Sequence, residues 1–500
     1  MTGFLTRFLL ILVATATIAS AQSSDQSVVL TTLDGELTVE GELISYEGEL
    51  FRVETEFGPV TLDGGNVTCE GPGCPPAEAL LAEAVIVGSL DLLTELVAPL
   101  VSGFAVAEGF AFSEEFIADD HIIWRLSDIE ADQMVARIEA LSDARRPDLG
   151  VRRGEPDEGA LADVIALDAL VVVVSPENDL ALMPVETLRL ILEGRLKAWP
   201  DWMAVGAPTG SRDIDLVLPE PLLGFDRLFP DRPLLSPSEA TRIADVDDLA
   251  DKVAGSANAL GVAPLSRIGN ASPLILAGTC GRAMPATAAS LKAEDYPLTD
   301  PIFLTRYSAR LPRVLRDLVA FMKSDDAQPI IRSTGLIDQS IGRTAFADQG
   351  DRLGYAVLAA GDDPVAIEHM RRMIRALVEA ERLTLTFRFE DGSSALDAPS
   401  RSNARQLAEA IADGKFDGKE LLFAGFTDSL GDLEPNLRLS QRRAESAFAS
   451  VRAQLGNPPV GFAAEGFGEA LPIACDDTDW GRHVNRRVEV WVRPLPAEEN

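Results

Sequence analysis

Two charged side chains near the end of the chain have the types and the spacing to bind a zwitterion. Asp428 follows the apolar run Leu421 to Ala424, which predicts a strand that ends in a turn. Arg443 follows in the next predicted helix. An arginine binds a carboxylate through two parallel hydrogen bonds, and an aspartate accepts an ammonium group. On spacing alone the two side chains fit either a zwitterion receptor or an internal salt bridge.

The helix that carries Arg443 is predicted by apolar residues that recur with helical spacing. They are Ala444, Ala447, Phe448, Val451 and Leu455. Arg443 lies one turn before Ala447, at the margin of this buried stripe. We expect Asn436 or Ser440 to cap the helix by accepting hydrogen bonds from its free N–H groups. This cap places Arg443 in the first turns of the helix, where the helix dipole also favours an anion.

The surrounding motifs are similar to those of a known family. The order TD, N, LSxxRA, GFGE and NRRVEVWV resembles the OmpA-like peptidoglycan-binding domain, and the resemblance extends over about 383–496. It implies an α+β fold in which Asp428 and Arg443 hold the diaminopimelate residue of the peptidoglycan stem peptide. The resemblance also implies four supporting residues: Thr427, Asn436, Leu439 and Arg487. One departure is the pair Gly425 and Phe426, where the family often carries His or Tyr.

The first residues have the pattern of a secretory signal peptide, residues 1–21. Arg7 supplies a positive charge, Phe8 to Ile18 is apolar, and Ala19 to Ala21 is a small-residue cleavage site. The apolar run is shorter than the roughly 20 residues that cross a bilayer, and charged residues interrupt the later apolar segments. We therefore expect a periplasmic protein with no transmembrane segment in its mature chain.

Length and charge exclude several functional classes. The 500 residues correspond to about three domains of roughly 150 residues each. A formal charge of -35 argues against binding to nucleic acid or to an anionic membrane surface, because both require basic patches. The chain has no HExxH motif, no P-loop and no paired Cys/His set, so we expect neither an enzyme nor a metal or other cofactor.

Residues 22–76 predict a small, acidic all-β module. Apolar and polar residues alternate between DG, EG and GG turn signals, and acids far outnumber the single basic residue, Arg52. The acidic face fits either a solvated sheet surface or a docking surface for a basic protein partner.

The four cysteines fall into two groups. Cys69 and Cys74 flank a short Gly/Pro loop, which predicts a local disulfide in an oxidising compartment that closes a barrel-like module. Cys280 and Cys475 are far apart in the sequence. The sequence leaves three alternatives open: the two cysteines pair with each other across an interface, remain free thiols, or pair with other partners.

Residues 80–341 predict an α/β region, because strands alternate with helices. The predicted strand Ala84 to Val87 ends in Gly88 and Ser89 just before a helix. N–H groups at a helix start and a serine hydroxyl donate hydrogen bonds to an anion, although the same turn also serves for chain connection alone.

Two stretches of this region are similar to a second family. IALDALVVVVSP (165–176) and DYPLTDPIFL (295–304) resemble the periplasmic phosphate-binding proteins of ABC importers, which have a two-lobed type II binding fold. The resemblance implies an anion site made by the following residues: Gly88, Ser89, Arg152 and Arg153. The third ligand loop of that family carries Ser-Gly-Thr, whereas the corresponding Pro219 to Phe229 has no hydroxyl. A phosphate would lose several charge-assisted hydrogen bonds there, so phosphate, another small anion and no ligand all remain open.

Residues 342–382 resemble neither family and predict helices that connect the two regions. The expected architecture is multidomain: a small all-β module, a two-lobed α/β domain with the type II periplasmic-binding-protein fold, and an α+β OmpA-like domain. The main functional hypothesis is a protein tethered to peptidoglycan that also captures phosphate or another small anion. The alternative is an envelope-organising scaffold whose middle domain has lost its ligand and binds proteins.

Overall fold

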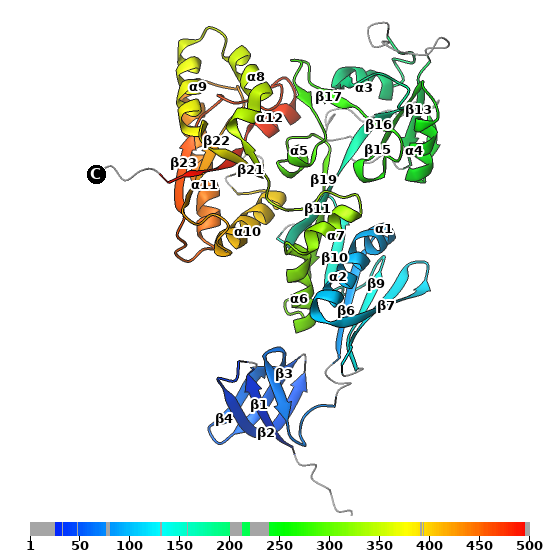
Figure 1. Cartoon of the computed structure of the whole chain (residues 1–500), viewed down its shortest axis with the longest axis vertical. Helices are drawn as coiled ribbons and strands as arrows, with labels where there is room; N and C mark the ends of the chain where they lie inside the picture. Colours follow the sequence, from blue (N-terminus) through cyan, green and yellow to red (C-terminus); the bar gives the residue numbers. More distant parts are fainter. Residues whose placement is uncertain are drawn as a thin grey trace, which may run out of the picture. The chain divides into compact units, whose positions relative to one another are not determined.

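The computed structural model describes residues 26–495 with gaps at 33, 48, 77–80, 131–132, 158, 201–212, 221–239, 391–392 and 394. The expected signal peptide, residues 1–21, lies outside the described residues. The chain divides into two compact units, one ending at Ala82 and one beginning at Glu83 (Figure 1).

The first unit is an antiparallel sheet of five strands in the order β4-β3-β2-β1-β5. The predicted alternation appears in its buried side chains, which are Val28, Leu30, Phe51 and Val53. One strand, β2, is ten residues long and has a bulge in its pairing with β3. The predicted disulfide between Cys69 and Cys74 is present. The strands are β1 Ser27–Thr32, β2 Thr38–Glu47, β3 Leu50–Thr55, β4 Gly58–Asp63 and β5 Val67–Glu70.

The second unit begins with a two-lobed α/β domain built on one mixed sheet. The strand order is β14-β13-β15-β11-β19-β10-β6-β9-β8-β7, with β16 beside β11. Two long strands, β11 (Leu161–Val174) and β19 (Thr299–Arg306), lie at the centre of this order and pair with each other. One lobe extends to each side of them, which confirms the predicted two-lobed architecture (Figure 1).

The two lobes share β11 and differ in their other elements. The first lobe contains β6 Ala82–Gly88, β7 Phe110–Ala118, β8 His121–Asp128, β9 Gln133–Leu141, β10 Leu149–Arg153, α1 Leu90–Leu92, α2 Ala98–Glu108, α6 Arg313–Lys323 and α7 Ala327–Ser333. The second contains β12 Leu182–Pro184, β13 Asp215–Pro219, β14 Thr241–Ile243, β15 Ala259–Pro264, β16 Ser272–Pro273, β17 Ile275–Ala277, β18 Ala283–Met284, α3 Val185–Leu192, α4 Val246–Ala254 and α5 Ala288–Lys292. The second half of β11, Val171 to Val174, is fully buried in the core of the second lobe.

One described helix is long and apolar enough to cross a membrane by length and composition alone. It runs from Leu90 to Glu108 through α1, a π-helical stretch and α2, and half of its apolar window is buried. This differs from our expectation that charged residues interrupt every such segment, because Asp91 and Glu95 both lie in its first turns. The helix packs against α6, α7 and β7, so we assign it to the core of the first lobe.

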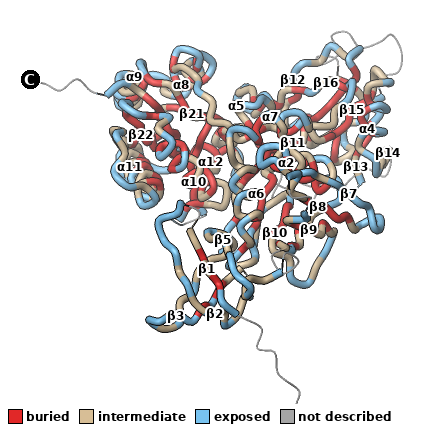
Figure 2. Tube along the Cα trace, turned by 60° about the horizontal axis from the view of Figure 1, so that its bottom comes forward, coloured by how far each residue is buried: buried red, intermediate tan, exposed pale blue. Residues whose placement is uncertain are grey.

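The C-terminal part of the second unit is a five-stranded sheet in the order β20-β21-β24-β22-β23. Helices α10 and α11 cover one face of this sheet, and the strands contribute a largely buried core (Figure 2). The predicted strand from Leu421 to Ala424 is present within β22. The elements are β20 Arg343–Ala345, β21 Glu381–Phe387, β22 Lys419–Gly425, β23 Gly461–Gly466, β24 Val488–Pro494, α10 Ala398–Ala412, α11 Leu433–Arg452 and α12 Asp479–Asn485.

The predicted connector, residues 342–382, is helical but does more than connect. It contains β20, an edge strand of the C-terminal sheet, followed by α8 (Gly350–Ala360) and α9 (Pro364–Leu377). Both helices pack on the sheet face opposite α10 and α11, where Met373 and Leu377 meet Trp491 in one core cluster. The second face of the sheet is also apolar and must be buried by packed helices. Because α8 and α9 bury it, the segment belongs to the C-terminal domain.

The C-terminal domain is joined to both lobes of the middle domain. Cys280 of the second lobe forms a disulfide with Cys475, a pairing that the sequence left open. Another link to the second lobe is the ion pair between Arg382 and Asp295, 2.6 Å. On the first lobe, α6 is linked to α10 by an ion pair of 2.7 Å between Lys323 Nζ and a glutamate oxygen of α10. These links hold the domain against the middle domain on both sides of β11.

Candidate functional site

Asp428 lies in the loop after β22 and is nearly buried, with 8% of its surface exposed. Its Oδ2 accepts a hydrogen bond of 2.9 Å from Nη1 of Arg486, and its Oδ1 accepts one from the Leu430 amide. The salt bridge that spacing suggested between Asp428 and Arg443 is therefore not formed. The aspartate is instead neutralised by an arginine that follows α12, close to the start of β24.

Arg443 lies in the middle of α11 rather than in its first turns. The helix starts at Leu433 after Asp432, so the predicted caps Asn436 and Ser440 are wrong and lie inside the helix. The early start is compatible with Pro435, because the first turn of a helix needs no internal N–H donor. The dipole at the helix start therefore does not act at Arg443.

The guanidinium of Arg443 lacks an ion-pair or hydrogen-bond partner among the described residues. Its Nη1 is buried without an acceptor, and its Cζ lies 5.7 Å from the centre of the Phe389 ring. Burial lowers the pKa of Arg443 below its usual value, repulsion from Arg486 adds to this, and Asp428 opposes it. Arg443 thus lies within electrostatic range of Asp428, and its Nη1 donor has no acceptor among the described residues.

Asn436 and Thr427 hold the loop that carries Asp428. Asn436 Nδ2 donates to the carbonyl oxygens of Asp428 (3.3 Å) and Leu430 (3.0 Å) and to a carboxylate oxygen of Glu469 (2.9 Å). Thr427 donates its N–H to the Gly468 carbonyl, 2.9 Å, and its buried hydroxyl has no partner within the described residues. These contacts fix the loop in place.

The other two residues that we expected to support the site, Leu439 and Arg487, differ in how far they are buried. Leu439 is half-buried on α11. Arg487 is fully buried, donates from Nε to Glu489 at 2.8 Å, and lies 4.5 Å from the centre of the Phe426 ring. Burial lowers the pKa of Arg487 to about 9. Arg487 is thus a core residue under the site, and its neighbour Arg486 is the arginine that reaches Asp428.

The sequence reasoning missed Arg486, Glu469 and Asp476. Asp476 accepts a hydrogen bond of 2.8 Å from the Ser429 amide, on the side of the loop where Glu469 also lies. Burial raises the pKa of Glu469, and the charges of Asp476 and Asp428 add to this increase. The loop therefore lies close to the acids Glu469 and Asp476 as well as to Arg486. Two motifs named above contain signals for these residues, because GFGE ends in Glu469 and NRRVEVWV carries Arg486.

The side chains of the predicted anion site in the first lobe are exposed or already paired with carboxylates of the protein. Gly88 ends β6, and Ser89 is exposed and makes no side-chain hydrogen bond at the helix start. Arg152 is exposed and lies 3.5 Å from a carboxylate oxygen of Asp157. Arg153 is bound to two carboxylates, which belong to Asp168 (3.1 Å) and Asp300 (2.9 Å).

The four residues therefore bring no unpaired guanidinium to a common point. Of the third ligand loop, only Pro219 and Glu220 lie within the described residues. Among the described residues, no group of three or more His, Cys, Asp or Glu side chains is placed to hold a metal ion.

Comparison with known proteins identifies the C-terminal domain. Residues 388–486 match the model of the OmpA family. The C-terminal domain is OmpA-like. A stretch of 116 residues is 34% identical to outer membrane porin F of Pseudomonas fluorescens, covering 23% of this chain and 35% of the porin. Another of 113 residues is 34% identical to the peptidoglycan-associated lipoprotein of Pseudomonas putida, covering 22% of this chain and 64% of the lipoprotein.

The OmpA-like domain accounts for about a fifth of the chain, and the chain spans less than two thirds of either relative. Among solved structures, an ABC-type phosphate transport receptor from Vibrio cholerae is similar over 51% of this chain and 99% of its own. The sequence identity is 15% and the TM-score 0.36. At that score the likeness supports no conclusion, so the two-lobed architecture rests on the sheet order described above.

Proposed function

We propose that this is a periplasmic protein tethered non-covalently to peptidoglycan through its OmpA-like domain. The family match of residues 388–486 supports this role, as does the likeness to a protein named peptidoglycan-associated lipoprotein. The relatives reported above are a porin and a lipoprotein of the envelope, so we propose a binding role and no catalytic one.

The observation that carries the proposal is the buried Nη1 donor of Arg443, which has no acceptor among the described residues and lies within electrostatic range of Asp428. A buried donor without an acceptor costs about 1–3 kcal/mol, and a ligand carboxylate removes that cost with a charge-assisted bond. The diaminopimelate residue offers a carboxylate and an ammonium on the same carbon. Its carboxylate faces Arg443, and its ammonium faces Asp428 and the acids beside it, Glu469 and Asp476.

The observations give weaker support for a ligand in the middle domain. Ser89 is exposed and its hydroxyl does not cap the helix that follows, which supports capture of a small anion. The charge of Arg153 is already offset by two carboxylates, which supports the alternative of a scaffold that binds proteins. We favour the scaffold, because an anion would have to displace carboxylates that the fold itself supplies.

Sedimentation of the full chain with isolated peptidoglycan tests the tethering proposal. We expect the wild type to pellet with the wall, and Arg443→Ala and Asp428→Ala to remain in the supernatant. Arg438→Ala is the matched control, because Arg438 lies on the same helix, is largely exposed and, among the described residues, forms an ion pair only with Glu434. Circular dichroism establishes that each variant is folded. If folded Arg443→Ala pellets as the wild type does, the proposed site is wrong.

A further inference from the structure

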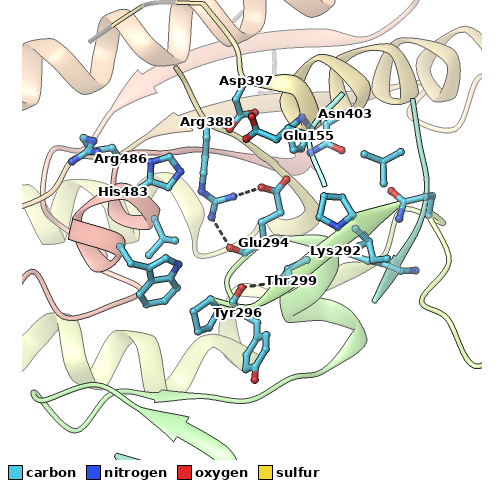
Figure 3. A pocket seen from close by; sticks show the side chains of 18 of the residues that line it. Glu155, Lys292, Glu294, Tyr296, Thr299, Arg388, Asp397, Asn403, His483 and Arg486 are labelled. Carbon is cyan, nitrogen blue, oxygen red and sulfur yellow. Dashed lines mark hydrogen bonds and ion pairs between the residues drawn. The ribbon is translucent and has the colours of Figure 1, made fainter. Parts of the chain in front are cut away.

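A pocket of about 570 Å³ lies between the middle domain and the OmpA-like domain. This size is typical of sites for small ligands. The middle domain contributes Glu155, Glu294 and Tyr296 to its lining, and the OmpA-like domain contributes Arg388 and Asp397 (Figure 3). Trp480 of the OmpA-like domain also lines the pocket. The family match begins at residue 388, so one wall of this pocket is made by residues outside the OmpA family domain.

The pocket adjoins the proposed peptidoglycan site through Arg486. Arg486 lines the pocket and also donates to Asp428, 2.9 Å. Helix α12, which supplies Trp480 and His483 to the pocket, ends directly before Arg486. A molecule held at Asp428 and Arg443 therefore has the pocket as its neighbouring surface.

The pocket contains more carboxylate side chains than its lysine and arginine side chains neutralise. Its lysine and arginine side chains are each paired: Lys292 with Asp338 (2.9 Å), Arg388 with Glu294 (3.0 Å) and Arg486 with Asp428 (2.9 Å). Glu155 and Asp397 have no basic partner among the described residues. The carboxylates of a stem peptide are repelled by this surplus, whereas uncharged hydroxyl groups donate hydrogen bonds to it.

Two buried donors in the same pocket point to a ligand with acceptor oxygens. Arg388 is only 2% exposed and lines the pocket, yet its Nε has no acceptor within the described part of the chain. The Nε2 of Gln339, another lining residue, is also buried without a partner. Hydroxyl and amide carbonyl oxygens satisfy both groups without bringing negative charge into the pocket.

We infer that this interdomain pocket binds an N-acetylated amino sugar of the glycan strand whose stem peptide is held at Asp428 and Arg443. The sugar hydroxyls donate to Glu155 and Asp397, and its oxygens accept from Arg388 and Gln339. The indole of Trp480 offers an apolar surface for the sugar ring. The inference rests on the proposed function and deepens it: the middle domain becomes part of the wall-binding site.

Calorimetric titration of the full chain with two soluble probes tests the inference. The probes are the disaccharide–tripeptide N-acetylglucosaminyl-N-acetylmuramyl-L-alanyl-D-isoglutamyl-meso-diaminopimelate and the same tripeptide without sugars. We expect the wild type to bind the disaccharide–tripeptide at least about tenfold more tightly, or about 1.4 kcal/mol. In the double variant Glu155→Gln with Asp397→Asn, we expect the ratio of the two affinities to fall below about threefold, while the affinity for the tripeptide stays unchanged.

The control double variant is Glu379→Gln with Asp413→Asn, which removes the same charge from exposed positions outside the pocket. Asparagine at position 397 also preserves the cap of α10, so the variant tests charge and not helix stability. Equal affinity of the wild type for the two probes overturns the inference and leaves the proposed function standing. Failure of both probes to bind overturns the proposed function as well. A ratio retained in the pocket variant also contradicts the inference.

Discussion

Arg153 of the two-lobed domain and Arg443 of the OmpA-like domain were both expected to bind an anion, and the fold treats them differently. Arg153 is bound by the carboxylates of Asp168 and Asp300. Arg443 has no carboxylate within ion-pair distance among the described residues, and one of its donors is buried without an acceptor. The first arginine has its counter-charge inside the protein, and the second has donors left for a ligand.

Arg388 is intermediate between these two cases. It is almost fully buried and has one carboxylate partner, Glu294, at the junction of the two domains. Burial raises the pKa of Glu294 to about 7, and the nearby charge of Asp397 adds to this increase while Arg388 opposes it. The presence of an arginine in a predicted site is therefore weak evidence for a ligand until its internal partners are known.

The largest expected effect is a difference in the free energy of unfolding between the Arg153→Ala and Arg443→Ala variants. Arg153→Ala leaves the buried carboxylate of Asp168 without its cation, so we expect a loss of about 3 kcal/mol in the free energy of unfolding. Arg443→Ala breaks no ion pair, and we expect a change within about 1 kcal/mol. Urea unfolding of both variants checks this. Equal losses would mean that Arg443 is held by the fold as firmly as Arg153.

The intermediate case, Arg388 with Glu294, predicts a pH dependence. The folded pKa of Glu294, about 7, lies above its unfolded value, so its contribution to stability is present at low pH and is lost as pH rises to about 7. Because one fifth of the side chain is exposed, we expect the wild type to lose about 2 kcal/mol relative to Glu294→Gln between pH 5 and pH 8. Comparison with this variant removes the opposite contributions of other carboxylates. Parallel stability profiles of the two proteins would contradict a raised pKa.

The smallest expected effect concerns phosphate. A ligand at 100 times its dissociation constant stabilises a protein by about 2.7 kcal/mol, which shifts melting by several degrees. Because the partners of Arg153 are internal, we expect phosphate to shift the melting of the full chain by less than about 1 °C relative to chloride at equal ionic strength. We expect the diaminopimelate tripeptide to produce a clear shift. A large shift with phosphate alone would restore the solute-binding hypothesis.

Much of the fold was predictable because its signals are local. The alternating residues of the first unit, the apolar run of β11 and the strand β22 all follow from short-range periodicity. The start of α11 was not predicted, because two plausible caps, Asn436 and Ser440, lie within the helix and are used to hold neighbouring loops. Helices α8 and α9 were predicted as helices, while the sheet face that they cover lay outside local sequence signals.

The sequence by itself determined the order of the domains, most of their strands and helices, and the motif that brings Asp428 near Arg443. Only the tertiary structure decided which charges meet. Asp428 and Arg486 are 58 residues apart, and Arg153 and Asp300 are 147 residues apart. The disulfide between Cys280 and Cys475 spans 195 residues. Such partners are chosen by packing of whole domains, because a charged group in the interior takes the nearest counter-charge that the fold supplies.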